Sequence, residues 1–352
     1  MRLFCGEAKK SLLTQKGLLI LCLCLLLKVL TLSFFPEQKD ERILLSQKQY
    51  DKYLEQLHGE SSPEKNAWIL QEYENCKNTI AQREIMEDRH LSGEITEEQW
   101  QEYTQALNDA YLHLNSAQIF AEKAEQFEAQ DPALPKAHYI YEYGWETVFT
   151  ILQLPDLFLL FALLILAAQC FSAEATGGML PVLLAARDGR RRLYWTKLLA
   201  LLVISLGAAA AFFGAEVLVF SRRGFLNDPN APLYSVSFMT DCRFDSSLIR
   251  AYWLQLGIRG VATLSFVALI YGLSIWLRNT TNLLFLGLCL LALPLVWNQT
   301  LCLFTHGGLL TGSKTLTWLG GSGWNPVVPV AVILGYTLPV ILLAERRHQR
   351  GL

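Results

Sequence analysis

Long apolar runs alternate with polar segments along most of the chain, and this alternation is the main structural signal in the sequence. Six runs have about the twenty predominantly apolar residues that a helix needs to cross a bilayer. They cover residues 17–35, 148–171, 198–220, 253–277, 283–304 and 325–343. The pattern predicts an all-α fold, a polytopic membrane protein with six transmembrane helices, five of them within residues 147–344.

The chain begins with a short basic segment in front of the first apolar run. Residues 1–16 contain several basic side chains and a few apolar ones. This combination predicts an amphipathic helix on the cytoplasmic membrane surface. Residues 17–35 resemble a signal peptide, but no A-x-A cleavage site occurs and Lys28 interrupts the later part. We therefore interpret them as a retained first transmembrane helix that Pro36 ends.

The polar segment 36–146 separates the first two apolar runs and has clear helix-start signals. Ser62-Pro63 is typical of an N-cap followed by proline in the first turn. Thr96 and Gln99 have the spacing of a capping box. These signals predict that the segment is helical.

A stripe of apolar residues follows the capping box at spacings of three and four. It comprises Trp100, Tyr103, Leu107, Ala110, Leu114, Ala117, Ala121 and Ala124. A shorter stripe precedes it, and Ser92-Gly93 separates the two. This arrangement predicts an antiparallel helical hairpin of coiled-coil type, preceded by a shorter helix at residues 40–57. The aromatic side chains of the stripe are expected in its core.

Four aromatic residues alternate immediately before the second apolar run: Tyr139, Tyr141, Tyr143 and Trp145. Tyrosine and tryptophan are enriched where a transmembrane helix leaves the bilayer, so we expect an aromatic belt at the outer interface. A carbohydrate-binding strip is the alternative interpretation.

Composition and charge set the class of protein and its orientation. With 52% hydrophobic and 18% charged residues, the chain is too apolar for an ordinary soluble enzyme. The net charge of −2 conceals a segregation, because residues 37–142 hold about 22 acidic and about 10 basic residues. Residues 172–197 and 345–352 are basic, and the positive-inside rule places them in the cytoplasm. We expect a multi-pass plasma-membrane protein with both termini cytoplasmic and residues 36–146 extracellular. Nothing indicates a nucleic-acid partner.

Four ionisable residues interrupt the apolar runs: Lys28, Asp156, Glu216 and Arg259. A charge inside the bilayer is costly unless it faces water or a partner. Lys28 is expected to reach the outer interface or to meet an acidic partner, and Arg259 to pair with Glu216 or Asp156. Pro155-Asp156 also predicts a kink near the outer end of the second transmembrane helix.

Motifs for catalysis and for metal binding are missing from the sequence. It has no G-x-x-x-x-G-K-[ST] phosphate-binding loop, no H-E-x-x-H and no G-x-S-x-G. We therefore expect no catalytic residue, no metal site and no cofactor bound by this chain. Of the eight cysteines, Cys76 and Cys242 alone fall on the outer side, either as a disulfide or as two free thiols.

The basic segment 172–197 resembles the cytoplasmic loop of ABC transporter permeases of the type-2 exporter family. In that family a Glu ends the second transmembrane helix, a Gly-Thr or Gly-Met opens a short helix, and an Arg and a Lys precede the third. These positions correspond to Glu174, Gly178, Met179, Arg190 and Lys197. Met179 in place of the commoner Thr, and Arg187 in place of Pro, depart from the usual form.

The resemblance implies the permease subunit of an ATP-driven exporter. Its partners would be a cytoplasmic ABC ATPase subunit, which binds ATP and Mg²⁺, and a second permease copy, identical or related. The loop would insert a coupling helix at residues 178–186 into the ATPase, with Met179, Leu180 and Leu183 on its apolar side. The resemblance leaves the substrate open.

Two alternatives remain beside the transporter. One is a multi-span receptor or adaptor whose acidic extracellular helical domain binds a ligand or partner. The other is an intramembrane enzyme, which the missing pairs of His, Asp or Ser residues disfavour.

Overall fold

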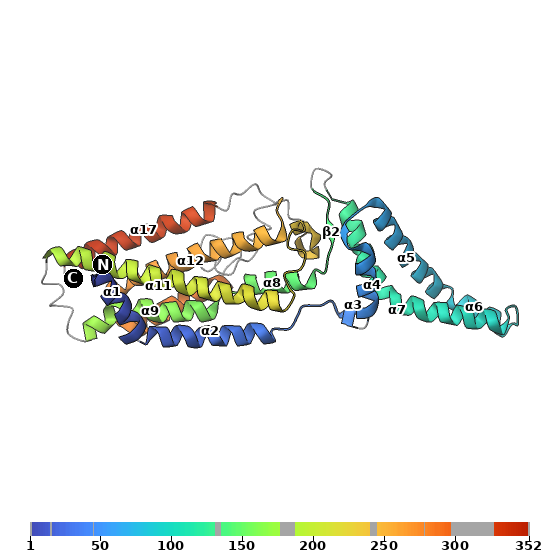
Figure 1. The fold of residues 1–352 in the computed structure, drawn as a ribbon, viewed down its shortest axis with the longest axis horizontal. Helices are drawn as coiled ribbons and strands as arrows, with labels where there is room; N and C mark the ends of the chain where they lie inside the picture. The colour runs from blue at the N-terminus through green and yellow to red at the C-terminus, as the bar shows by residue number, and fades with distance from the viewer. Residues whose placement is uncertain are drawn as a thin grey trace. The chain divides into compact units, whose positions relative to one another are not determined.

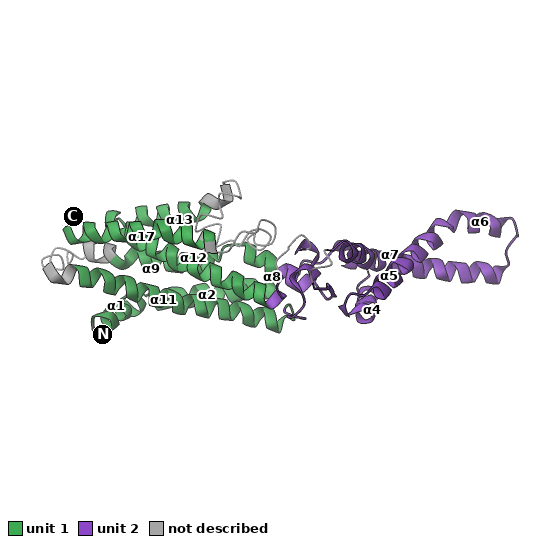
Figure 2. Cartoon of the chain, turned by 90° about the horizontal axis from the view of Figure 1, so that it is seen from above, with its two compact units in different colours: residues 1–36, 148–225, 250–352 green, residues 37–147, 226–249 purple. Residues whose placement is uncertain are grey.

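The chain is mostly helical in a computed structural model, which describes residues 2–14, 16–44, 46–130, 135–176, 187–239, 245–277, 279–296 and 327–350. It divides into two compact units, coloured separately in Figure 2. Unit 1 comprises residues 1–36, 148–225 and 250–352, and unit 2 comprises residues 37–147 and 226–249. The chain passes four times between the two units.

Unit 1 is a bundle of apolar helices that lie alongside one another (Figure 1). The helices are α2 (Gly17–Phe34), α9 (Leu157–Thr176), α11 (Arg187–Arg222), α12 (Leu248–Trp276), α13 (Thr280–Val296) and α17 (Val327–Arg350). Leucine, alanine, isoleucine and phenylalanine side chains from all six form one continuous core. Among the described residues, four stretches are long and apolar enough to cross a membrane: Gly17–Phe34, Tyr143–Cys170, Arg191–Arg222 and Leu248–Trp276. The structure thus agrees with a helical membrane protein.

The N-terminal segment folds as two short helical pieces. Helix α1 (Arg2–Lys9) is followed by one π-helical stretch, η1 (Lys10–Thr14), and α1 packs against α11. Lys16 then adopts a left-handed backbone conformation with φ 57°, and α2 begins at the next residue.

The second apolar run is broken where the sequence predicts a kink. Helix α8 (Tyr143–Gln153) ends just before Pro155, and α9 begins at Leu157. Asp156 is the N-cap of α9, because its Oδ1 accepts a hydrogen bond from the Leu159 amide at 3.1 Å. Proline cannot supply the amide that a continuous helix would need here, and the aspartate then restarts the helix.

The third apolar run begins earlier than expected. Helix α11 starts at Arg187, eleven residues before the predicted start at Leu198. The prediction of a loop over all of residues 172–197 is therefore wrong at both ends, since α9 also continues to Thr176. Arginine, leucine and lysine are good helix formers, and the basic end of α11 needs no apolar surroundings to be helical.

Unit 2 contains helices α3 (Glu41–Leu44), α4 (Gln47–Leu57), α5 (Pro63–Ala81), α6 (Arg83–Leu91) and α7 (Glu97–Glu128). Helix α5 packs along α7 with the opposite direction, and Tyr103 of α7 donates a hydrogen bond to the Thr79 carbonyl near the end of α5. The predicted helix starts are confirmed: Ser62 caps α5 with Pro63 in its first turn, and Thr96 and Gln99 form a capping box.

Two features of unit 2 were not predicted. Strands β1 (Gly59–Glu60) and β2 (His138–Tyr139) form a short antiparallel pair, with Gly59 opposite Tyr139. Residues 226–249, which lie between the third and fourth apolar runs, also belong to this unit. There the Trp145 indole donates a hydrogen bond to the Asn227 carbonyl at 2.5 Å.

The aromatic residues before the second apolar run lie in the core of unit 2. Tyr139, Tyr143 and Trp145 are buried, and Tyr139 and Tyr143 pack with Tyr50, Phe120 and their neighbours. Their burial does not fit a belt that faces the membrane interface: Tyr139 and Tyr143 pack on side chains of α4 and α7, and Trp145 donates a hydrogen bond to residue 227. Cys76 is a buried free thiol, and Cys242 lies outside the described residues.

Candidate functional site

The four ionisable residues that interrupt the apolar runs come together inside unit 1. Lys28 of α2 places its Nζ 2.6 Å from Asp156 Oδ2 and 2.7 Å from Glu216 Oε2 of α11. Glu216 Oε1 lies 3.3 Å from Nη1 of Arg259 on α12. Of the two partners expected for Arg259, the structure thus selects Glu216. We call these four residues the charge quartet.

The quartet is electrically balanced and almost fully removed from solvent. The side chains are 6% (Lys28), 6% (Asp156), 1% (Glu216) and 3% (Arg259) exposed. Two basic and two acidic side chains balance one another, and their pairing offsets part of the cost of burying them in an apolar bundle. Phe213 of α11 lies beside both cations, 5.7 Å from Lys28 Nζ and 5.5 Å from the Arg259 guanidinium carbon.

The hydrogen bonds in the quartet are unevenly distributed. The Lys28 ammonium has three donors and uses them on Asp156, Glu216 and the Phe212 carbonyl, the last at 3.2 Å. Arg259 has five N–H donors, and among the described residues only Nη1 has a hydrogen-bond acceptor, Glu216. At 3.3 Å this contact is longer than is usual for a charge-assisted hydrogen bond.

A cavity of about 230 Å³ adjoins the quartet within unit 1. All four quartet residues line it, and its remaining lining is Thr31, Leu32, Phe35, Ile151, Leu154, Pro155, Leu157 and Phe158. Leu154 and Leu157 are exposed, at 52% and 60%, so the cavity has an apolar rim on the surface of the bundle. A charged interior behind an apolar rim suits an amphiphilic ligand.

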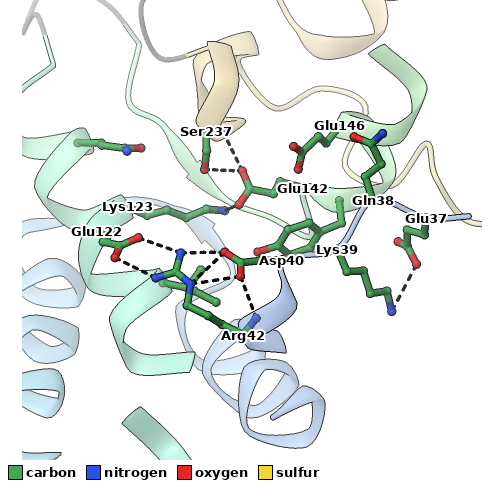
Figure 3. Close-up of a pocket in the computed structure, with 13 residues that line it drawn as sticks. Glu37, Gln38, Lys39, Asp40, Arg42, Glu122, Lys123, Glu142, Glu146 and Ser237 are labelled. Carbon is green, nitrogen blue, oxygen red and sulfur yellow. Dashed lines mark hydrogen bonds and ion pairs between the residues drawn. The ribbon is translucent and has the colours of Figure 1, made fainter. Parts of the chain in front are cut away.

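A second, larger cavity of about 510 Å³ lies in unit 2 (Figure 3). Five carboxylates line it: Glu37, Asp40, Glu122, Glu142 and Glu146. Lys39, Arg42 and Lys123 are its basic residues. The acidic excess makes this cavity a candidate site for a cationic group, although most of its charges already have partners.

A buried ion pair forms the back of the unit 2 cavity. Lys123 Nζ of α7 lies 2.8 Å from Glu142 Oε1, and the two side chains are 2% and 4% exposed. Glu142 Oε2 accepts hydrogen bonds from the backbone amide and the hydroxyl of Ser237, each at 2.7 Å (Figure 3). The pair therefore ties residues 226–249 to the helices of unit 2.

The mouth of this cavity carries an arginine between two carboxylates. Arg42 makes two hydrogen bonds to Glu122, at 2.9 and 3.2 Å, and also binds Asp40 (Figure 3). The bound guanidinium lowers the pKa of Asp40 below its ordinary value. Tyr141 donates to Glu37, and burial together with this carboxylate raises the pKa of the Tyr141 hydroxyl.

The residues expected to contact an ATPase are only partly described. Gly178, Met179, Leu180 and Leu183 lie outside the described residues. Glu174 falls in the last turn of α9 and Arg190 in the first turn of α11. Lys197 is buried, and its Nζ donates a hydrogen bond to the Cys170 carbonyl of α9 at 3.2 Å.

Several contacts join α11 to its neighbours near Lys197. Arg191 forms an ion pair with Glu345 of α17 at 2.9 Å. The Tyr194 hydroxyl donates to the Ile341 carbonyl of α17, and Tyr271 of α12 donates to the Tyr194 carbonyl. Hydrogen bonds and an ion pair therefore join the basic end of α11 to α9, α12 and α17.

The Lys123–Glu142 pair and the Arg42 cluster were missed in the sequence. Both residues of the pair look like ordinary surface charges in a polar segment, and no local spacing marks them as partners. The one available signal is that Lys123 lies between two alanines of the predicted apolar stripe, Ala121 and Ala124.

The described residues contain no group of three or more His, Cys, Asp or Glu side chains placed to hold a metal ion. Comparisons with protein-family models, curated proteins and solved structures find no match for this chain. The likeness to ABC permeases therefore depends on the residues of segment 172–197 and on the order of the apolar runs.

Proposed function

We propose that the chain is the membrane-spanning permease subunit of an ATP-driven ABC transporter, working as an exporter. In this proposal six transmembrane helices span the plasma membrane, with the fifth and sixth formed around α13 and α17. Both termini are cytoplasmic, and the helices of unit 2 stand outside the cell. The partner subunit binds and hydrolyses ATP, and a second permease copy completes the complex.

The observation that carries the proposal is the way the segment between α9 and α11 is anchored. Lys197 binds α9, and Arg191 and Tyr194 bind α17. A force applied to residues 177–186 would therefore act on three helices together rather than bend one of them. Rigid-body movement of packed helices is a common way to transmit a change between sites.

The test uses the permease purified in complex with its ATPase. We expect Glu174→Ala and Gly178→Pro to leave membrane insertion unchanged but to abolish transport-coupled ATP hydrolysis. Proline fixes φ at about −65°, so it removes the conformational freedom that glycine has at position 178, where the coupling helix is expected to begin. Arg346→Gln, an exposed change on α17, is the control and should hydrolyse ATP as the unaltered complex does. Normal stimulated hydrolysis in both loop variants would refute the assignment.

A receptor or adaptor is the second candidate, and the cavity of unit 2 favours it. A cavity of about 510 Å³ with an acidic lining could hold a cationic part of an extracellular ligand. Deletion of residues 40–129 tests whether the chain is a permease or a receptor. A permease should keep its ATPase after this deletion and change its substrate choice, whereas a receptor should lose all ligand response.

A further inference from the structure

We propose that the cavity beside the charge quartet binds the oxyanion headgroup of a membrane amphiphile, a phosphate or a carboxylate on an alkyl chain, with Arg259 as its receptor. The proposal does not depend on coupling to an ATPase. It depends on which hydrogen-bonding groups in the quartet are already used, and on the surface through which the cavity opens.

The unused hydrogen-bonding capacity of the quartet lies mainly on one residue. Each carboxylate oxygen already accepts a hydrogen bond: Asp156 from Lys28 and the Leu159 amide, Glu216 from Lys28 and Arg259. The three donors of Lys28 are also used. Arg259 is the exception, with one of its five donors used by the described residues.

A buried guanidinium with free donors is costly unless an acceptor fills the space beside it. Arg259 is 3% exposed as a side chain and lines the cavity, so an acceptor for its remaining donors has to enter through the cavity. The planar fork of arginine matches the paired oxygens of a phosphate or carboxylate. The missing group is therefore an acceptor, and an oxyanion satisfies more than one donor at once.

The rim of the cavity indicates where such a group comes from. Leu154 and Leu157 are exposed beside the opening, and both belong to a stretch apolar enough to cross a membrane. Thr31 of α2 is exposed on the same lining. An alkyl chain could lie on this rim while its headgroup reaches Arg259, whereas a free ion would gain nothing from the apolar lining.

Two tryptophan substitutions on α2 form a matched pair for the test. Thr31 lines the cavity, and Ser33 does not; both are exposed, and both hydroxyls donate to the carbonyl four residues earlier. Thr31→Trp should fill the entrance without touching a charge, and Ser33→Trp should leave it open. Arg259→Gln removes the receptor itself.

The experiment titrates the full chain, purified in a phosphate-free maltoside detergent, and counts bound molecules by native mass spectrometry. The probes are lysophosphatidic acid, oleic acid, monoolein and inorganic phosphate. We expect the unaltered chain and Ser33→Trp each to bind one molecule of lysophosphatidic acid or of oleic acid. Each of these two acids should bind at least about tenfold more tightly than monoolein. Thr31→Trp and Arg259→Gln should each lose at least about tenfold in affinity.

Three results would overturn the proposal. Equal binding of monoolein would mean that the cavity recognises only the alkyl chain. Inorganic phosphate binding as tightly as lysophosphatidic acid would mean that no alkyl chain is needed. Unchanged affinity in Thr31→Trp would place the bound molecule elsewhere, even if Arg259→Gln fails to fold.

Discussion

Single residues decide how charge is accommodated inside the apolar unit. The sequence predicts partners for Lys28, Asp156, Glu216 and Arg259, because an unpaired charge in an apolar run is costly. It does not predict that Lys28 bridges two carboxylates, since its partners lie 128 and 188 positions away. Glu216 is the residue shared by both cations, and the balance of the quartet depends on it.

Removal of the Glu216 charge should destabilise unit 1 strongly. Glu216→Gln leaves two buried cations against one carboxylate, and breaking a buried pair costs about 3–5 kcal/mol. Thermal unfolding of the purified protein in detergent should show a clearly lower transition temperature. Arg346→Gln, at an exposed position, should change stability by less than about 0.5 kcal/mol. Equal transition temperatures in the two variants would mean that the ion pairs of the quartet do not stabilise unit 1.

The Asp40–Arg42 contact makes unit 2 sensitive to acid. Arg42 lowers the pKa of Asp40 from 3.8, so the folded state holds this proton less tightly than the unfolded state. The resulting stabilisation is present above pH 3.8 and is lost as the pH falls through the lower, folded-state pKa. Asp40→Asn should flatten the decline of the unit 2 melting temperature below about pH 4. Asp109→Asn, on the exposed face of α7, should retain the decline, and identical slopes in both variants would count against the contact.

At the scale of elements, helix ends were predicted better than the boundaries of the apolar runs. The caps at Ser62 and Thr96 follow from side chains within three residues of each helix start, so local sequence is sufficient. The break at Gln82 between α5 and α6 has no proline and no side-chain cap, and the early start of α11 lies in a basic segment that no apolar pattern marks. Residues 226–249 join unit 2 through contacts between distant positions, such as Glu142–Ser237 across 95 positions, and local sequence does not reveal these.

The capping box of α7 provides a test at this scale. Thr96 accepts a hydrogen bond from the Gln99 amide, and Thr96→Ala should cost about 1 kcal/mol. Hydrogen exchange of the first-turn amides of α7 should then be faster. Thr79→Ala removes a hydroxyl inside α5 that donates to the Asn75 carbonyl, and it should leave these amides protected. Unchanged exchange in Thr96→Ala would show that packing against α5, rather than the cap, holds the start of α7.

At the scale of the whole molecule, the segregation of charge and apolar surface accounts for the division into two units. Unit 1 holds all but the first few residues of the apolar stretches, and most of unit 2 comes from the acidic segment 37–142. Hydropathy marks the changes of composition near residues 36 and 147, but it does not predict that residues 226–249 belong to unit 2. Partners could not be predicted in the same way, since they depend on surfaces rather than on average composition. The segment around Glu174 and Arg190 therefore carries the functional proposal.

Isolation of the chain from its own cell membrane tests the central claim most directly. The measurement is the molar ratio of ABC ATPase polypeptide to permease after mild detergent extraction and affinity purification, determined by quantitative mass spectrometry. The account predicts about one ATPase chain per permease chain. A stable, correctly inserted chain that purifies without any ATPase would contradict it.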